Sequence, residues 1–264
     1  ALRLTIVNSA TSSAYESIRA YVAETTRTPS SARVVHAALE AAEEFGLPAP
    51  DAMTGEFMEF LGARAAGNSA LTGSTPTAII MSPACGVIGL HLFRGMHSAI
   101  LQAQEAGEDL TPKTTDGMLR GSAGSHPRAH GSGHITCIEP EIQHQKLARS
   151  AFQADGIPNN AYRFLPSAPL DVVSRLAQNS YDIAIVECSV EDFSTTVEAT
   201  LPALRPGGIL MLLDSLMDGT VRDRDRQDRQ ITSAREADEA IRRLPGAAVS
   251  RLPLGAGSTL VTKL

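Results

Sequence analysis

Tryptophan is missing from this 264-residue chain, aromatic residues make up only 4% of it, and cysteine occurs three times. With so few large rings, the hydrophobic core must be built mainly from Ala, Leu, Ile and Val. Cys85, Cys137 and Cys188 are too few and too far apart for a disulfide framework or a zinc cluster. Free thiols are typical of proteins in a reducing compartment, so we expect a cytoplasmic location.

Excess positive charge and long apolar runs are missing as well. The formal net charge is −6, which argues against broad binding to the phosphate backbone of nucleic acids. No apolar run approaches the roughly 20 residues that span a bilayer, and the first residues lack the basic segment and apolar stretch of a signal peptide. We therefore expect neither a nucleic acid nor a membrane as a partner.

What the chain does contain is a strand-turn-helix pattern at residues 77–89. Ala78 to Met81 form an apolar, partly β-branched run that suits a strand buried on both faces of a parallel sheet. Ser82 to Gly86 are small residues or proline, and a helical pattern follows from Val87. This succession is typical of the nucleotide-binding corner of a doubly wound α/β sheet. An ordinary tight turn between a strand and a helix is the alternative interpretation.

The segments around this corner predict one α/β domain over residues 1–264. Residues 1–76 are mostly helical, with helices expected at 12–26, 29–45 and 51–66 and a connector rich in Gly, Ser and Thr at 67–76. In the third helix we expect Phe57, Phe60 and Leu61 to face inward. Residues 77–264 form the α/β core, and residues 104–133, which lose apolar periodicity, are expected to be a flexible insertion.

Beyond the insertion, apolar strands alternate regularly with amphipathic helices. We expect strands at 134–139, 162–165, 182–187, 208–213, 248–254 and 258–262, and helices at 141–155, 169–178, 190–204 and 227–244. The last two strands have no helix between them and should form an antiparallel hairpin. The pattern predicts a seven-stranded, mostly parallel sheet with helices on both faces and a C-terminal antiparallel hairpin.

Three acidic residues follow or end strands of this sheet. Glu139 ends the second strand, where a carboxylate can accept hydrogen bonds from both hydroxyls of a ribose; the alternative is a helix cap near Glu141. Glu187 and Asp214 end the fourth and fifth strands and should be neighbours. Two such carboxylates suit a hard divalent cation or general acid-base chemistry, and the alternative is again helix capping.

The charged run Arg222 to Arg229 alternates in sign. We interpret it as the solvated start of a helix with internal ion pairs. Because it follows the strand that ends at Asp214, it could instead border the pocket of an acceptor molecule.

Taken together, these residues resemble the class I S-adenosylmethionine-dependent methyltransferases. The likeness is strongest to the small cation-dependent O-methyltransferases of the caffeoyl-CoA and catechol type found in bacteria. Its most specific parts are the order of the elements, Arg205 to Gly208 before the fifth strand, and Leu252 to Gly257 in the last hairpin. The resemblance implies a Rossmann-like methyltransferase fold, S-adenosylmethionine and a divalent cation (Mg or Ca) as cofactors, transfer to a hydroxyl of a small molecule, and a homodimer that uses the N-terminal helices.

The resemblance also assigns roles to individual positions. The loop that holds the methionine part of the cofactor corresponds to Ser82, Pro83, Ala84 and Gly86, the ribose acid to Glu139 followed by Pro140, and the adenine-side turn to Ser167 and Ala168. Glu187 corresponds to an acid that borders the cofactor and binds metal. The remaining metal ligands correspond to Asp214 and Ser215, and Glu187 and Asp214 would be the catalytic pair.

Several positions depart from the family pattern. Ile80 replaces an acid at the end of the first strand, Gly86 is the only glycine left of a Gly-x-Gly-x-Gly loop, and Pro83 lacks a backbone donor. Ser215 stands where an asparagine is expected and Val190 where a lysine is expected, which should weaken a cation site. Two alternatives follow: a methyltransferase-like binding protein without catalytic activity, and an NAD(P)-dependent oxidoreductase that uses a relaxed Gly-x-Gly-x-x-Gly motif.

Overall fold

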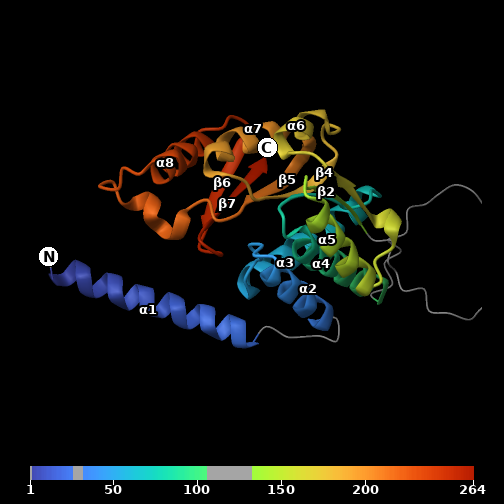
Figure 1. Ribbon diagram of the computed structural model, residues 1–264, viewed down its shortest axis with the longest axis horizontal. Helices are drawn as coiled ribbons and strands as arrows, with labels where there is room; N and C mark the ends of the chain where they lie inside the picture. The colour runs from blue at the N-terminus through green and yellow to red at the C-terminus, as the bar shows by residue number, and fades with distance from the viewer. Residues whose placement is uncertain (1, 26–31, 106–132) are drawn as a thin grey trace, which may run out of the picture.

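The computed structural model describes residues 2–25, 32–105 and 133–264. Its centre is a seven-stranded sheet in the order β3-β2-β1-β4-β5-β7-β6 (Figure 1). Strands β1 to β5 are parallel, whereas β7 pairs antiparallel with both β5 and β6. The strands are β1 (Thr77–Met81), β2 (His134–Ile138), β3 (Tyr162–Leu165), β4 (Tyr181–Val186), β5 (Leu204–Leu212), β6 (Ala247–Leu252) and β7 (Ser258–Lys263). The predicted fold class is confirmed.

Helices cover both faces of the sheet. The α-helices are α1 (Leu2–Thr25), α2 (Ala32–Glu44), α3 (Ala52–Thr72), α4 (Cys85–Glu105), α5 (Ile142–Ala154), α6 (Pro169–Val172), α7 (Phe193–Thr200) and α8 (Arg229–Arg242). Short 3₁₀ turns are η1 (Asn159–Ala161), η2 (Val173–Arg175), η3 (Val190–Asp192), η4 (Leu201–Ala203) and η5 (Met217–Arg222).

Alternate residues of each central strand enter two separate cores. Ile80 and Ile185 pack with α3, α4 and α5, whereas Ile79 and Val186 pack with α7 and α8. This division follows from the strand geometry, since successive side chains point to opposite faces. Because β1 lies between β2 and β4 and the strand order reverses there, the carboxyl ends of these strands border the crevice in which open α/β sheets bind ligands.

Helices α3 and α4 lie in backbone contact because each has a glycine that faces the backbone of the other helix. A Cβ atom on Gly95 would lie 1.9 Å from the carbonyl oxygen of Glu59, and one on Gly62 would lie 2.4 Å from the carbonyl oxygen of Leu92. The side chain of Glu59 then accepts from the Nδ1 atom of His91 at 2.9 Å and pairs with Arg94 at 3.3 Å. The two helices therefore form one rigid layer below the sheet corner.

Some helix predictions differ from the structure. Helix α3 continues to Thr72, through much of the predicted connector, and ends at Gly73 with φ +67°. Phe60 was expected to face inward but is 60% exposed. The predicted helix at 169–178 consists of only α6 and a 3₁₀ turn, and the one at 190–204 is an α-helix only from Phe193 to Thr200. Most of the predicted insertion, residues 106–132, lies outside the described residues.

Candidate active site at the carboxyl edge of the sheet

A hydrogen bond joins the first turns after β1 and β4. Met81 and Val186 are partners in the parallel ladder, so the residues that follow them, Ser82 and Glu187, emerge side by side. The hydroxyl of Ser82 donates to Oε2 of Glu187 at 2.7 Å and accepts from the backbone N–H of Ala84 at 3.0 Å. Ser82 is buried, so its side chain orients Glu187 and shapes the loop; the prediction that it contacts a cofactor is not tested by these contacts.

Glu187 is the most strongly perturbed carboxyl group of this edge. Its burial raises the pKa to about 7, against the lowering effect of the hydrogen bond from Ser82. The negative charges of Asp214 and Glu139 raise the pKa further, which also places these three carboxylates near one another. A carboxyl group with a pKa near neutrality exchanges a proton readily at physiological pH and suits general acid-base catalysis.

Glu139 follows β2 and is held by the start of α5. Its Oε1 atom accepts from the backbone N–H of Glu141 at 2.8 Å and from Nδ1 of His144 at 3.0 Å. The capping alternative was wrong, because the N-cap of α5 is Glu141 and Glu139 is buried before the helix begins. No hydrogen bond joins Oε2 to a described residue, so one oxygen of this buried carboxylate is available to a ligand.

The turn after β3 lies beside Glu139. The carbonyl oxygen of Leu165 accepts from the backbone N–H groups of both Glu139 and Ser167, at 3.1 and 2.9 Å. The predicted adenine-side residues Ser167 and Ala168 are therefore adjacent to the predicted ribose acid, and Ala168 and Pro140 are exposed. These residues lie 26 or more positions apart in the chain, and the register of β2 and β3 brings them together.

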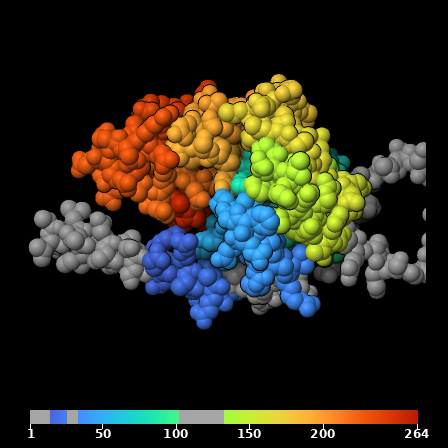
Figure 2. Space-filling model, in the orientation of Figure 1, coloured from blue at the N-terminus to red at the C-terminus, as the bar shows by residue number. Residues whose placement is uncertain are grey.

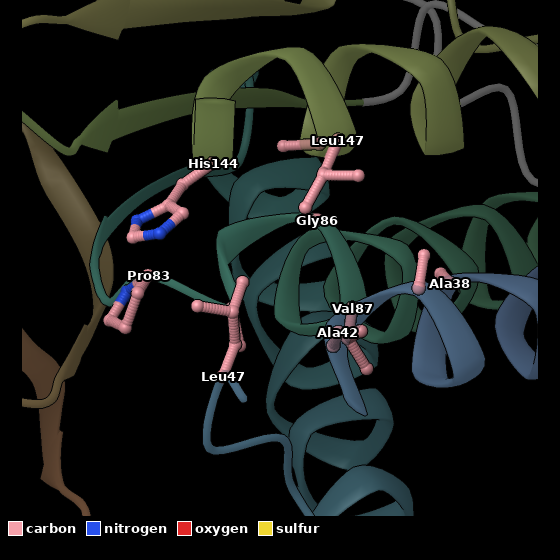
Figure 3. A pocket seen from close by; sticks show the side chains of 11 residues that line it. Ala38, Ala42, Leu47, Pro83, Gly86, Val87, His144 and Leu147 are labelled. Atoms are coloured by element: carbon pink, nitrogen blue, oxygen red, sulfur yellow. The ribbon is translucent and has the colours of Figure 1, made fainter. Parts of the chain in front are cut away.

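Gly86, a predicted cofactor-binding residue, lies against α5. A Cβ atom there would lie 2.8 Å from the Cα atom of Ala148, a contact that does not test the predicted role. Gly86 therefore permits close contact between α4 and α5. The hollow beside it, lined also by Pro83, Ala84 and His144, holds only about 20 Å³, which suffices for a single water molecule and not for a nucleotide (Figure 3).

Asp214 and Ser215 diverge from each other at the end of β5. Asp214 has φ +52°, and its Oδ1 atom accepts from the backbone N–H of Ala256 at 2.7 Å. The hydroxyl of Ser215 is buried and bonded to the hydroxyl of Thr259 at 2.8 Å. Both side chains thus contact the C-terminal hairpin, but Asp214 also lines the cavities beside Glu187, whereas Ser215 does not. Within the described ranges, no three His, Cys, Asp or Glu side chains are arranged to hold a metal ion.

Two cavities, of about 450 and 250 Å³, meet around Glu187 and Asp214. Apolar and charged residues both line the larger one, among them Val190, Phe193, Leu213, Met217, Ile231, Arg226 and Asp228. Arg226 and Asp228 of the run from 222 to 229 line this cavity, and they form an ion pair at 3.4 Å in an exposed segment, as the first interpretation predicted. The prediction that this run forms the start of a helix was wrong, because α8 begins only at Arg229, with Asp228 as its N-cap.

The smaller cavity shows residues that the sequence did not reveal. Arg19 of α1 contributes to its lining together with Asp51 and Thr54 at the start of α3. Arg19 and Asp51 are paired at 2.7 Å, and the hydroxyl of Tyr15 donates to the carbonyl oxygen of Pro253. Figure 2 shows this part of α1, in dark blue, beside the red surface of the C-terminal hairpin. Helical periodicity in α1 gave no sign of these long-range contacts.

This strand order with an antiparallel C-terminal hairpin is the Rossmann-like fold that O-methyltransferases of known structure share with this chain. The sequence profile of the O-methyltransferase family matches residues 128–264, just over half of the chain. This chain belongs to the O-methyltransferase family.

Individual proteins of known sequence or structure are similar to this chain. A Corynebacterium glutamicum protein of known crystal structure is 40% identical, with a TM-score of 0.75 over 95% of this chain and 97% of its own. A Mycolicibacterium smegmatis protein named as an O-methyltransferase is 26% identical over 91% of this chain and 95% of its own length. Another, from Mycolicibacterium vanbaalenii, is 29% identical over 47% of this chain, and that match spans only about half, 55%, of the relative.

A Bacillus cereus O-methyltransferase, solved in complex with S-adenosylhomocysteine, shares the fold. Its TM-score is 0.66 at 16% identity, over 94% of this chain and 97% of its own.

No helix in the described part of this chain is both long and apolar enough to cross a membrane.

Proposed function

We propose that this protein transfers a methyl group from S-adenosylmethionine to a hydroxyl of a small molecule. The observation that carries the proposal is the convergence of Glu139, Glu187 and the loop from Ser82 to Ala84 at the carboxyl ends of β2, β4 and β1. Family membership and the S-adenosylhomocysteine bound to the Bacillus cereus relative support the choice of cofactor. The turn at Ser167 and Ala168, next to Glu139, is the proposed site of the adenine.

The chain's own residues suit this cofactor at one point in particular. Oε2 of Glu139 is an acceptor without a partner among the described residues, and a ribose presents two hydroxyl donors. S-adenosylmethionine would supply an electrophilic methyl group on its sulfonium. Pro140 and the loop formed by Ser82, Pro83 and Ala84 would border the bound cofactor, and Gly86 would act by fixing α4 beneath that loop.

Glu187 is the proposed general base. Because Oε2 of Glu187 is held by Ser82, Oε1 is left to accept the proton of the acceptor hydroxyl. Asp214, fixed by the backbone of Ala256, would orient the acceptor in the adjoining cavities. Positioning the two reactants contributes most to such a displacement, because there is little other chemistry for the protein to perform.

The donor set does not suit a divalent cation held by Glu187, Asp214 and Ser215. Ser215 is bonded to Thr259, one oxygen of Asp214 is bonded to Ala256, and burial favours the neutral form of Glu187. Hard cations require several oxygen ligands that converge. We therefore assign no step to a metal ion.

We also propose that the chain is a single domain that works as a cytoplasmic homodimer. Residues 1–76 contribute Arg19, Asp51 and Thr54 to the cavity beside Glu187, which supports treating them as part of the domain. Exposed apolar side chains on α1 and α3, including Tyr21 and Phe60, support an interface there. The free cysteines support a reducing compartment.

Calorimetry with S-adenosylhomocysteine, S-adenosylmethionine and NADPH tests the proposal. We expect S-adenosylhomocysteine and S-adenosylmethionine to bind and NADPH not to bind, and E139A to weaken the binding of S-adenosylhomocysteine at least tenfold. Incubation with radiolabelled S-adenosylmethionine and a panel of phenols should then transfer label to an acceptor. Binding of NADPH, or failure of both adenosyl compounds to bind, would contradict the proposal. Cofactor binding without transfer to any acceptor would favour the non-catalytic alternative.

A further inference from the structure

The carboxylate of Glu139 is held by a histidine that the proposed reaction does not otherwise use. Glu139 is only 5% exposed, and both of its side-chain hydrogen bonds enter the same oxygen, Oε1. One donor is the backbone of Glu141 and the other is the imidazole of His144. We propose that His144 is a positioning residue that orients Glu139 so that Oε2 faces a ribose, an inference that rests on the proposed function.

The chemistry of the pair fixes the direction of the hydrogen bond. An ionised carboxylate can only accept, so Nδ1 of His144 carries the proton that it donates to Oε1. A carboxylate with two donors on one oxygen cannot rotate about its Cγ–Cδ bond without losing at least one of them. The unoccupied oxygen is thereby held in one place before a ligand arrives, which lowers the entropic cost of binding.

The helix that carries His144 is itself anchored to the strand end. The Nε2 atom of Gln145 donates to the backbone carbonyl of Glu139 at 2.7 Å, and Ala148 packs against Gly86 of α4. Figure 3 shows the ring of His144 reaching from α5 towards Pro83 in the loop after β1. The histidine therefore links the proposed ribose acid to a rigid pair of helices, and it approaches the loop that would hold the methionine part of the cofactor.

The test is calorimetric titration with two probes, S-adenosylhomocysteine and its 2′-deoxyribose analogue. If His144 orients Glu139 for the ribose, H144A should weaken S-adenosylhomocysteine about tenfold and leave the deoxy analogue within about twofold, because only the first ligand offers the 2′-hydroxyl. The preference of the wild-type protein for the ribose should therefore nearly disappear in H144A.

Two further variants separate positioning from a general structural effect. Asparagine places its amide donor near the position of Nδ1, so H144N should restore most of the ribose preference. Gln143 is exposed on the same helix, and Q143A should bind both probes as the wild type does. Thermal unfolding of each variant shows whether it folds, and H144N keeps the test decisive if H144A does not.

The inference is overturned if H144A leaves the ratio of the two affinities unchanged, whether it weakens the binding of both probes equally or of neither. It is also overturned if H144N behaves like H144A while remaining folded. Failure of the wild-type protein to bind S-adenosylhomocysteine would instead remove the proposed function, so the two failures are distinguishable.

Discussion

At the residue scale, one strand position determines the character of Glu187. Because β4 is central, its first residue beyond the strand emerges between the ends of β1 and β5 and is largely removed from water. Burial raises the pKa of its carboxyl group, and the single hydroxyl of Ser82 offsets only part of that effect. Keeping this ionisable acid buried at the site therefore lowers the free energy of unfolding.

The replacement E187Q should reveal this cost through the pH dependence of stability. Native Glu187 retains its proton up to about pH 7, whereas the unfolded chain releases it near 4.5. The native state therefore binds more protons between these values. The stabilising contribution of protonated Glu187 is present below pH 4.5 and is lost as the pH rises through 7. Glutamine does not ionise, so E187Q should gain about 3 kcal/mol relative to the wild type between pH 4.5 and 8.

Urea unfolding at a series of pH values measures that difference. E191Q is the matched control, since Glu191 lies four residues further along and is exposed. Parallel stability curves for E187Q and the wild type would contradict the assignment of a raised pKa to Glu187.

At the scale of elements, the close contact of α3 and α4 determines where the loop after β1 lies. Gly62 and Gly95 let the two backbones touch, and Met58, Leu61 and Met96 are completely or almost completely buried beside them. Glycine is normally disfavoured in helices, because a glycine residue loses more conformational freedom on folding than other residues do. Here that cost is compensated by packing that only glycine permits.

Two glycine substitutions should therefore act in opposite directions. G95A would place its Cβ atom 1.9 Å from the carbonyl oxygen of Glu59, and separating the helices to relieve this overlap should cost about 3 kcal/mol. Gly67 lies in α3 with open space around it, so G67A should instead stabilise the protein by up to about 1 kcal/mol. Urea denaturation measures both changes. Equal effects of the two substitutions would show that helix propensity, and not close packing, dominates.

At the scale of the whole molecule, apolar side chains remain uncovered on the N-terminal helices. Ile18 and Tyr21 on α1 and Leu71 on α3 are exposed, as is Phe60, whose ring stacks on that of Phe57 at 6.0 Å between centroids. Exposed apolar patches of this kind often mark protein–protein interfaces.

The proposed homodimer predicts that a charge at Phe60 will separate the subunits. Sedimentation velocity should show a dimer for the wild type and a shift towards monomer for F60E, because a carboxylate buried in an apolar interface loses its hydration. Ile142 is similarly exposed, on α5, and I142E should leave the dimer intact. A monomeric wild type, or an F60E variant that remains fully dimeric, would contradict the proposal.

Most of the architecture could be predicted from the sequence because it depends on local periodicity. Ala78 to Met81 and Ile183 to Val186 are apolar runs that identify central strands, and the absence of a helical pattern around Gly255 predicts the antiparallel hairpin. Predictions were less accurate where tertiary contacts override propensity. Helix α3 passes through Gly67, and the segment from Pro169 becomes a short helix followed by a 3₁₀ turn.

The individual roles at the site were less accessible. Ser82, Glu139 and Glu187 were identified as candidates, but the bond between Ser82 and Glu187, 105 residues apart, has no local signature. Gly86 was identified as a candidate cofactor-binding residue, but its close contact with Ala148 of α5 also has no local signature. Ser215 was a candidate metal ligand, yet its hydroxyl is bonded to Thr259.

By itself, the sequence determined which strand ends carry acids, because chain position along a parallel sheet places each carboxyl end at one edge. Only the tertiary structure decided what each acid does there, through burial, strand register and the choice of hydrogen-bond partner. The physical reason is that a pKa or an available oxygen depends on nearby atoms in space, and for Glu187 those atoms belong to Ser82, Glu139 and Asp214, which lie 27 to 105 residues away in the chain.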